Sequence, residues 1–84
     1  MVKKSNIRFA QLRAFFEGLG FSATREEKGW RIEHAPTGTV FIFRPYRSNE
    51  LVYAPDLFLI RSQLNARGLL AEEEFDESLT KTPV

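Results

Sequence analysis

The hydrophobic residues of this 84-residue chain begin with a helical spacing. The apolar stripe over residues 6–18 and just beyond contains Ile7, Leu12, Phe15, Phe16 and Leu19. Apolar side chains at this spacing share one face of a helix. Ser5 or Asn6 can cap the first turn. Gly20 can end the helix, because glycine takes the left-handed conformation without a steric penalty.

The spacing then changes to that of strands. Residues 21–25 and 30–35 alternate between apolar and polar positions, and residues 39–44 are apolar on both faces. A strand that is apolar on both faces is usually covered on both sides. The segment Pro36-Thr37-Gly38 between them is typical of a tight turn. The pattern predicts three short strands, with Trp30, Ile32 and His34 on one face of the second.

A second helical pattern follows a proline-bounded loop. Pro45 ends the third strand because it cannot donate to the ladder, and residues 46–53 are predicted to form a polar loop. Pro55 is suited to the first turn of a helix, and Gly68 can end it. The side chains predicted to face inward are Leu57, Ile60 and Leu64, with Phe58 beside them.

The C-terminal segment is acidic. Residues 71–79 can form one or two further helical turns, with Phe75 and Leu79 as their apolar edge. The last five residues are expected to lack regular structure.

These elements predict one α+β domain over residues 1–84. Its core spans about residues 6–70, and the acidic segment covers residues 71–84. The order α-β-β-β-α favours a two-layer arrangement, in which a three-stranded antiparallel sheet carries both helices on one face.

Composition excludes several classes of site. The chain has no cysteine and one histidine, so disulfides, thiolate metal sites and multi-histidine metal sites are excluded. We expect no metal and no cofactor. No apolar run approaches the roughly 20 residues that span a membrane. A cytoplasmic protein without a membrane partner is therefore expected.

Charge is distributed unevenly although its total is only +1. Residues 1–49 hold nine Lys/Arg against four Glu, whereas residues 50–84 hold three Lys/Arg against seven Asp/Glu. A basic front of this kind favours an anionic partner, while ordinary surface charge with a solvated acidic tail explains it equally well.

A series of short motifs gives the chain a family resemblance. They are Leu19-Gly20-Phe21, Arg25, Pro36-Thr37-Gly38, Asn49-Glu50-Leu51, and Leu57, Ile60 and Leu64 followed by Gly68-Leu69. In this order the chain from about Ile7 to Phe75 resembles the HicA toxin family, which has a double-stranded-RNA-binding-like fold. The resemblance implies a small bacterial or phage protein of a toxin–antitoxin pair, whose relatives cut mRNA and are inhibited by an antitoxin.

The catalytic histidine of that family has no counterpart here. The family signature is Gly-Ser-His at the start of the second strand. Counting back from Pro36-Thr37-Gly38 places Gly29-Trp30 at the Ser-His positions, so Trp30 replaces the histidine. His34 is the one remaining candidate for acid–base catalysis, and a structural histidine at the hairpin explains it as well. Any enzyme here would be a metal-independent ribonuclease.

RNA binding and protein binding both have candidate residues. The residues chosen for RNA are Lys28, Trp30, Arg31, Arg44 and Arg47, because cations contact phosphates and an exposed aromatic ring can stack on bases. Trp30 is equally compatible with core packing.

A protein interface is predicted at the third strand. One of its two apolar rows, Val40/Ile42 or Phe41/Phe43, has no helix to meet in a two-layer domain. The interface residues chosen are Phe41, Phe43 and Phe75. Covering by a homodimer, by the C-terminal segment or by an antitoxin-like protein would each satisfy the pattern.

Three functions follow from the sequence. The first is an RNA-binding, HicA-like module that has lost cleavage. The second is a protein-interaction module on the same scaffold, and the third is a divergent mRNA-cutting enzyme.

Overall fold

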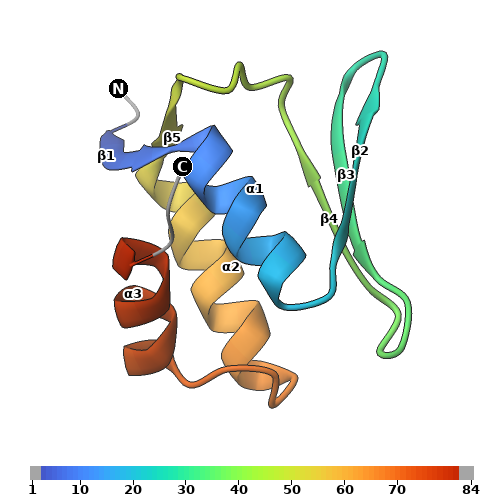
Figure 1. The fold of residues 1–84 in the computed structure, drawn as a ribbon, viewed down its shortest axis with the longest axis vertical. Helices are drawn as coiled ribbons and strands as arrows, with labels where there is room; N and C mark the ends of the chain where they lie inside the picture. The colour runs from blue at the N-terminus through green and yellow to red at the C-terminus, as the bar shows by residue number, and fades with distance from the viewer. Residues whose placement is uncertain (1–2, 82–84) are drawn as a thin grey trace.

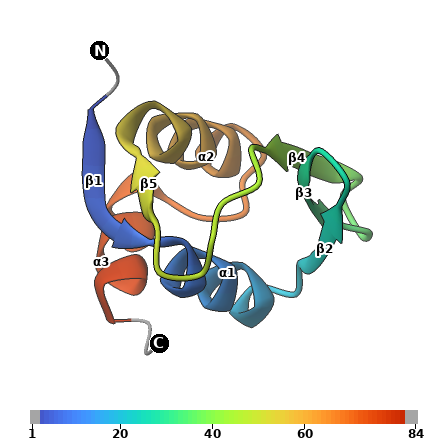
Figure 2. The same cartoon turned by 90° about the horizontal axis from the view of Figure 1, so that it is seen from above.

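The computed structural model describes residues 3–81 and shows an α+β fold (Figure 1). In chain order the elements are β1 (Lys4–Arg8), α1 (Phe9–Gly18), β2 (Ser22–Glu26), β3 (Gly29–His34), β4 (Thr39–Phe43), β5 (Leu51–Tyr53), α2 (Ala54–Ala66) and α3 (Glu72–Lys81). Strands β2, β3 and β4 form an antiparallel sheet in that order, while β1 pairs with β5 in a separate ribbon. Figure 2 shows α1 and α2 on the same face of the larger sheet, which confirms the predicted two-layer arrangement.

The register of the sheet separates its two faces. Trp30 lies opposite Phe43, and Ile32 lies opposite Phe41, so these four side chains share the face toward the helices. Ile32, Phe41 and Phe43 are at most 5% exposed. The other face carries Ile42, which is 65% exposed. The prediction that both faces of this strand are covered is therefore wrong within the described residues.

The N-terminal segment is a strand where the sequence predicts a helix. Residues 4–8 pair with β5, and α1 begins only at Phe9. The hydroxyl of Ser5 donates to the carbonyl of Val52 at 2.7 Å, so it bonds across the ribbon instead of capping the helix. Carbonyl oxygens of the 44–50 loop take the capping role, since Phe9 N–H donates to Glu50 and Ala10 N–H donates to Ser48.

The predicted polar loop over residues 46–53 is also incorrect at its C-terminal end. Residues 51–53 form β5, and Val52 is completely buried. The short segment pairs with β1 and leads directly into α2. Its partner β1 lies about 45 residues away in sequence, and the local pattern of apolar and polar residues cannot predict so distant a pairing.

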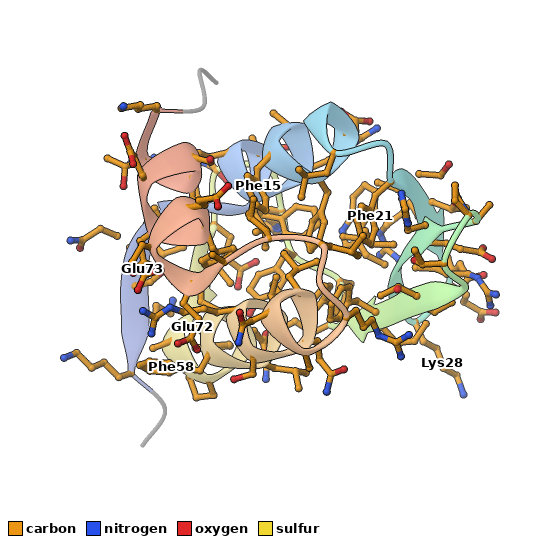
Figure 3. The ribbon with its side chains drawn as sticks, turned by 90° about the horizontal axis from the view of Figure 1, so that it is seen from below. Phe15, Phe21, Lys28, Phe58, Glu72 and Glu73 are labelled. Atoms are coloured by element: carbon orange, nitrogen blue, oxygen red, sulfur yellow. The ribbon has the colours of Figure 1, made fainter. Side chains whose placement is uncertain are left out.

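The second helix follows the sequence except at one side chain. Pro55 lies in its first turn, and Gly68 ends it in the left-handed conformation at φ +71°. Ile60 and Leu64 are completely buried, as predicted. Phe58 is 64% exposed, so its predicted inward orientation is wrong (Figure 3). Its side chain lines a groove with Ile7 of β1 and Phe75 of α3.

The acidic C-terminal segment forms a longer helix than the sequence predicts. Helix α3 runs through Lys81, so Thr80 and Lys81, two of the five residues expected to lack regular structure, are helical. The other three, residues 82–84, lie outside the described residues. Phe75 and Leu79 are buried as its apolar edge. Phe75 meets Phe15 edge-on at a centroid distance of 5.3 Å, and Gln11 of α1 donates to the Leu79 carbonyl at 2.6 Å.

Gly29 marks a point where two backbones meet. A Cβ atom built there would lie 2.0 Å from the carbonyl oxygen of Phe43 in β4. No side chain fits at that distance unless the strands separate. The close approach also places the β2–β3 turn beside the point at which the chain leaves the sheet for the 44–50 loop.

We expect Gly29→Ala to lower the free energy of unfolding by about 1–3 kcal/mol, because the added methyl group forces the β3–β4 pair apart. Gly18→Ala is the matched control. Gly18 lies in α1 with open space around it, so alanine there should raise stability by about 0.5–1 kcal/mol. Urea unfolding of both variants measures the difference. Equal stability of the two variants would contradict the close approach.

Candidate nucleic-acid interface

Tyr46 fixes the loop between β4 and β5. Its hydroxyl donates to Asp56 of α2 at 2.5 Å and accepts from the Tyr53 N–H of β5 at 3.0 Å. Its carbonyl accepts from the indole N–H of Trp30 in β3 at 3.0 Å. One residue thus ties the loop to the larger sheet, to the small ribbon and to α2. The loop crosses the end of the molecule shown in Figure 2.

Four rings form a continuous aromatic row under this loop. The row consists of Trp30, Phe9, Tyr46 and Tyr53, with centroid separations of 5.0, 5.3 and 6.1 Å between successive rings. Phe9 and Tyr46 are buried, whereas Trp30 and Tyr53 at the two ends are half-buried. Rings packed at such distances form a rigid base for the residues above them.

Cations cover both ends of the aromatic row. The Arg44 guanidinium lies 4.1 Å from the centre of the Tyr53 ring, and the Lys4 ammonium lies 5.7 Å from it. The Arg13 guanidinium lies 5.1 Å from the Trp30 ring at the other end. Contacts of this kind hold a cation at a ring face while leaving its donors available.

Two further arginines are carried by the same loop and ribbon. Arg8 donates to the Asn49 carbonyl at 2.6 Å, and Arg47 lies in the loop itself. We call Lys4, Arg8, Arg44 and Arg47 the basic surface. All four residues are exposed.

The carboxylates close to the basic surface already have partners. Glu50 accepts from the Arg47 backbone N–H at 3.1 Å, and Asp56 accepts from the Tyr46 hydroxyl. Figure 3 shows Glu72 and Glu73 of α3 on the side of the molecule opposite Lys28 and the larger sheet. Helix α3 lies beside β1, and Ile7 of β1 and Asp76 of α3 line the same groove.

The five residues predicted to bind RNA do not lie together in the structure. Arg44 and Arg47 belong to the basic surface. Lys28 lies in the β2–β3 turn and extends away from the body of the protein (Figure 3). Trp30 is half-buried with its N–H engaged, so core packing accounts for most of the ring. Arg31 lies opposite Ile42 on the outer face of the sheet, where it pairs with Glu33 at 3.3 Å.

Lys4 and Arg8 complete the basic surface above Tyr53, although the sequence does not single out these three residues as a group. Lys4 lies opposite Tyr53 in the β1–β5 pairing. The available sequence signal was the alternation in Lys4-Ser5-Asn6-Ile7-Arg8, since a strand places Lys4, Asn6 and Arg8 on one exposed side. The helical interpretation of residues 6–18 obscured it.

His34 has a structural environment. Its ring stacks on Phe21 at a centroid distance of 4.8 Å, and Nδ1 lies 2.7 Å from the Thr37 hydroxyl of the hairpin. Gly20 lies next to the ring, since a Cβ atom built there would be 3.8 Å from His34 Cδ2 and Nε2. These neighbours orient the ring within the hairpin, and none of them is a carboxylate.

The residues predicted to form a protein interface are inside the protein. Phe41 and Phe43 are each 5% exposed and Phe75 is 2% exposed, so none of the three presents a surface to a second chain. Register explains the correction, because Phe41 and Phe43 point to the helices while Val40 and Ile42 point outward. The C-terminal segment packs on the helices and leaves that outward row uncovered.

Comparisons with known protein families, with curated proteins and with solved structures found no match to this chain. Among residues 3–81, no group of three or more histidine and carboxylate side chains could hold a metal ion. None of the helices in this part of the chain is long and apolar enough to cross a membrane.

We expect Tyr46→Phe to lower the free energy of unfolding by about 1–3 kcal/mol, because the Tyr53 N–H loses its acceptor. Tyr53→Phe is the matched control, since no hydrogen bond of its hydroxyl is present among the described residues. That variant should stay within about 0.5 kcal/mol of the wild type. Chemical denaturation at neutral pH compares them.

The stability difference between wild type and Tyr46→Phe should also depend on pH. Burial, together with the hydrogen bond to Asp56, raises the pKa of the Tyr46 hydroxyl well above its ordinary value of 10.0. The tyrosine then ionises more readily in the unfolded chain, so its stabilising effect is present below pH 10 and is lost as the pH rises further. The stability advantage of wild type over Tyr46→Phe should therefore narrow between about pH 9 and pH 11. A constant or widening advantage would contradict this assignment.

Proposed function

We propose that this protein binds RNA through the basic surface and does not cleave it. The observation that carries the proposal is the gathering of Lys4, Arg8, Arg44 and Arg47 over a rigid aromatic base at one end of the molecule. The resemblance to HicA toxins supplies the independent reason to favour RNA among anionic partners.

The arrangement suits contact with a phosphate backbone. Phosphate contacts need positive side chains and supply most of the affinity that does not depend on sequence. Arg44 is held against Tyr53 at 4.1 Å, so it loses less conformational freedom on binding than an unsupported side chain. The exposed parts of Tyr53 and Trp30 can add contacts to bases or sugars.

The absence of cleavage rests on the environments of two residues. Trp30, at the position where the resemblance places a catalytic histidine, is bonded to Tyr46 and packed on Phe9. His34 is stacked within the hairpin and lies on the sheet rather than on the loop that carries Arg44 and Arg47. In this proposal the protein is a non-catalytic, cytoplasmic relative of bacterial or phage toxin–antitoxin components.

We expect the double variant Arg44→Glu/Arg47→Glu to bind RNA at least about tenfold more weakly at low salt, because two phosphate contacts become repulsive. The loss should be similar for unrelated RNA sequences. The slope of log affinity against log salt should fall by about one unit for each lost contact. Fluorescence anisotropy with labelled single-stranded and duplex RNA measures both quantities.

The matched control is Arg31→Glu/Arg67→Glu, which changes net charge equally on exposed residues outside the basic surface. It should weaken binding only slightly, through long-range attraction. An equal loss in both double variants would show that net charge alone attracts the RNA. Undetectable binding of wild-type protein at low salt would refute the proposed function.

Wild-type protein and His34→Ala should leave RNA intact. The physical reason is that no acid–base pair is assembled next to the basic surface in the described part of the chain. Gel analysis of a mixed mRNA substrate after prolonged incubation measures the products. Cleavage by the wild type that disappears in His34→Ala would restore the ribonuclease hypothesis.

A further inference from the structure

The outer edge of β4 is open. Among the strands of residues 3–81, β4 is the last of its sheet and pairs only with β3. Within residues 3–81, no backbone group outside the sheet bonds to Thr39–Phe43. Alternate N–H and C=O groups of this strand therefore point away from β3 with no backbone partner. Such an edge is a template for another extended chain.

Strand β4 lacks the sequence features that protect an edge strand from pairing with another chain. Edge strands are commonly protected by a charged side chain, a proline or a bulge. Residues Thr39–Phe43 contain no charge and no proline, and their pairing with β3 is regular throughout. The outward side chains are Val40, which is 39% exposed, and Ile42, which is 65% exposed. An added strand would cover both the backbone groups and this apolar row.

A groove beside the edge can receive side chains of the added strand. Its volume is about 210 Å³, and its lining residues are Thr39, Val40, Phe41, Ile42, Leu59, Gln63 and Arg67. One wall is thus β4 and the other is the outer side of α2, where Leu59 is 49% exposed. Side chains alternate across a strand, so half of those on an added strand would enter this groove and half would lie along Ile42.

One charge in the groove has no ion-pair partner. Arg67 is exposed at the C-terminal end of α2 and forms no ion pair with any residue of the described chain. The other nearby arginine, Arg31, is already paired with Glu33. A carboxylate on the added strand would complement Arg67.

The groove argues against a second copy of this chain as the occupant. A two-fold pairing of β4 with β4 would place Thr39–Phe43 of the second copy against the edge. This segment contains no charged side chain, so it offers no carboxylate to Arg67. A segment with an acidic residue does.

We propose that an extended, acidic segment of a partner protein adds to the free edge of β4 as a fourth strand of the sheet. Its backbone pairs with β4, its apolar side chains pack on Val40, Ile42 and Leu59, and a carboxylate meets Arg67. This mode of recognition takes affinity from main-chain hydrogen bonds and specificity from alternate side chains. The surface is separate from the basic surface, so the inference does not depend on RNA binding.

The test uses a synthetic probe and isotope-labelled full-length protein. The probe is a heptapeptide with blocked ends, in which valine alternates with threonine and glutamate. Amide shifts on titration should concentrate on residues 39–43 and on α2 residues 59–67. Amides of β4 that point away from β3 should gain protection from hydrogen exchange.

Two probe controls and three protein variants isolate the mode of binding. A peptide N-methylated at alternate residues cannot pair and should fail to bind. A peptide with lysine in place of glutamate should bind about fivefold more weakly to the wild type, and Arg67→Glu should reverse that preference. Ile42→Lys should weaken binding about tenfold. Phe58→Lys is the matched control, because Phe58 is as exposed as Ile42 but lines a different groove, and it should leave binding unchanged.

Each contrary result overturns the proposal. No binding at millimolar peptide, equal binding of the N-methylated peptide, or shifts confined to other residues would exclude strand addition at β4. A dimer in analytical ultracentrifugation that Ile42→Lys converts to a monomer would assign the edge to a second copy instead.

Discussion

The arrangement of this protein depends on the anchoring of Tyr46. The loop that holds it connects the larger sheet to the small β1–β5 ribbon, and Tyr46 hydrogen-bonds to the sheet, to the ribbon and to α2. The three hydrogen bonds are partly buried, so water does not fully replace one that is removed. Because the same loop supplies carbonyl oxygens to the first turn of α1, its position also determines where that helix begins.

The basic surface is a consequence of this anchoring. Arg44 and Arg47 flank Tyr46 in the chain, while Lys4 and Arg8 come from the strand that the loop positions. Their repulsion is offset because Arg44 and Lys4 lie against the Tyr53 ring. The aromatic row thus supports the exposed cations that the proposed RNA contact requires.

The outer edge of the larger sheet is apolar, in contrast to the basic surface. There the chain presents an apolar row and an open backbone edge, because three strands and two helices bury only one face of β4. Two surfaces of different chemistry on one small domain are consistent with two different partners. The acidic helix α3 lies on the side of α1 and α2 away from the larger sheet and hence away from the edge of β4, and its Phe75 and Leu79 join the core.

The sequence alone determined the elements whose signals are local. Residues 21–25 and 30–35 alternate, residues 39–44 are apolar on both faces, and Pro55 and Gly68 bound α2, so the three-stranded sheet and second helix were predictable. Residues 4–8 and 51–53 were not, because each is a strand only through the other, and local spacing reports no partner 45 or so residues away. Likewise, sequence indicated cations and aromatics as candidates for RNA binding. Tertiary structure decided that Arg44 and Arg47 join Lys4 and Arg8 while Arg31 faces the other way, because strand register selects the face of each side chain.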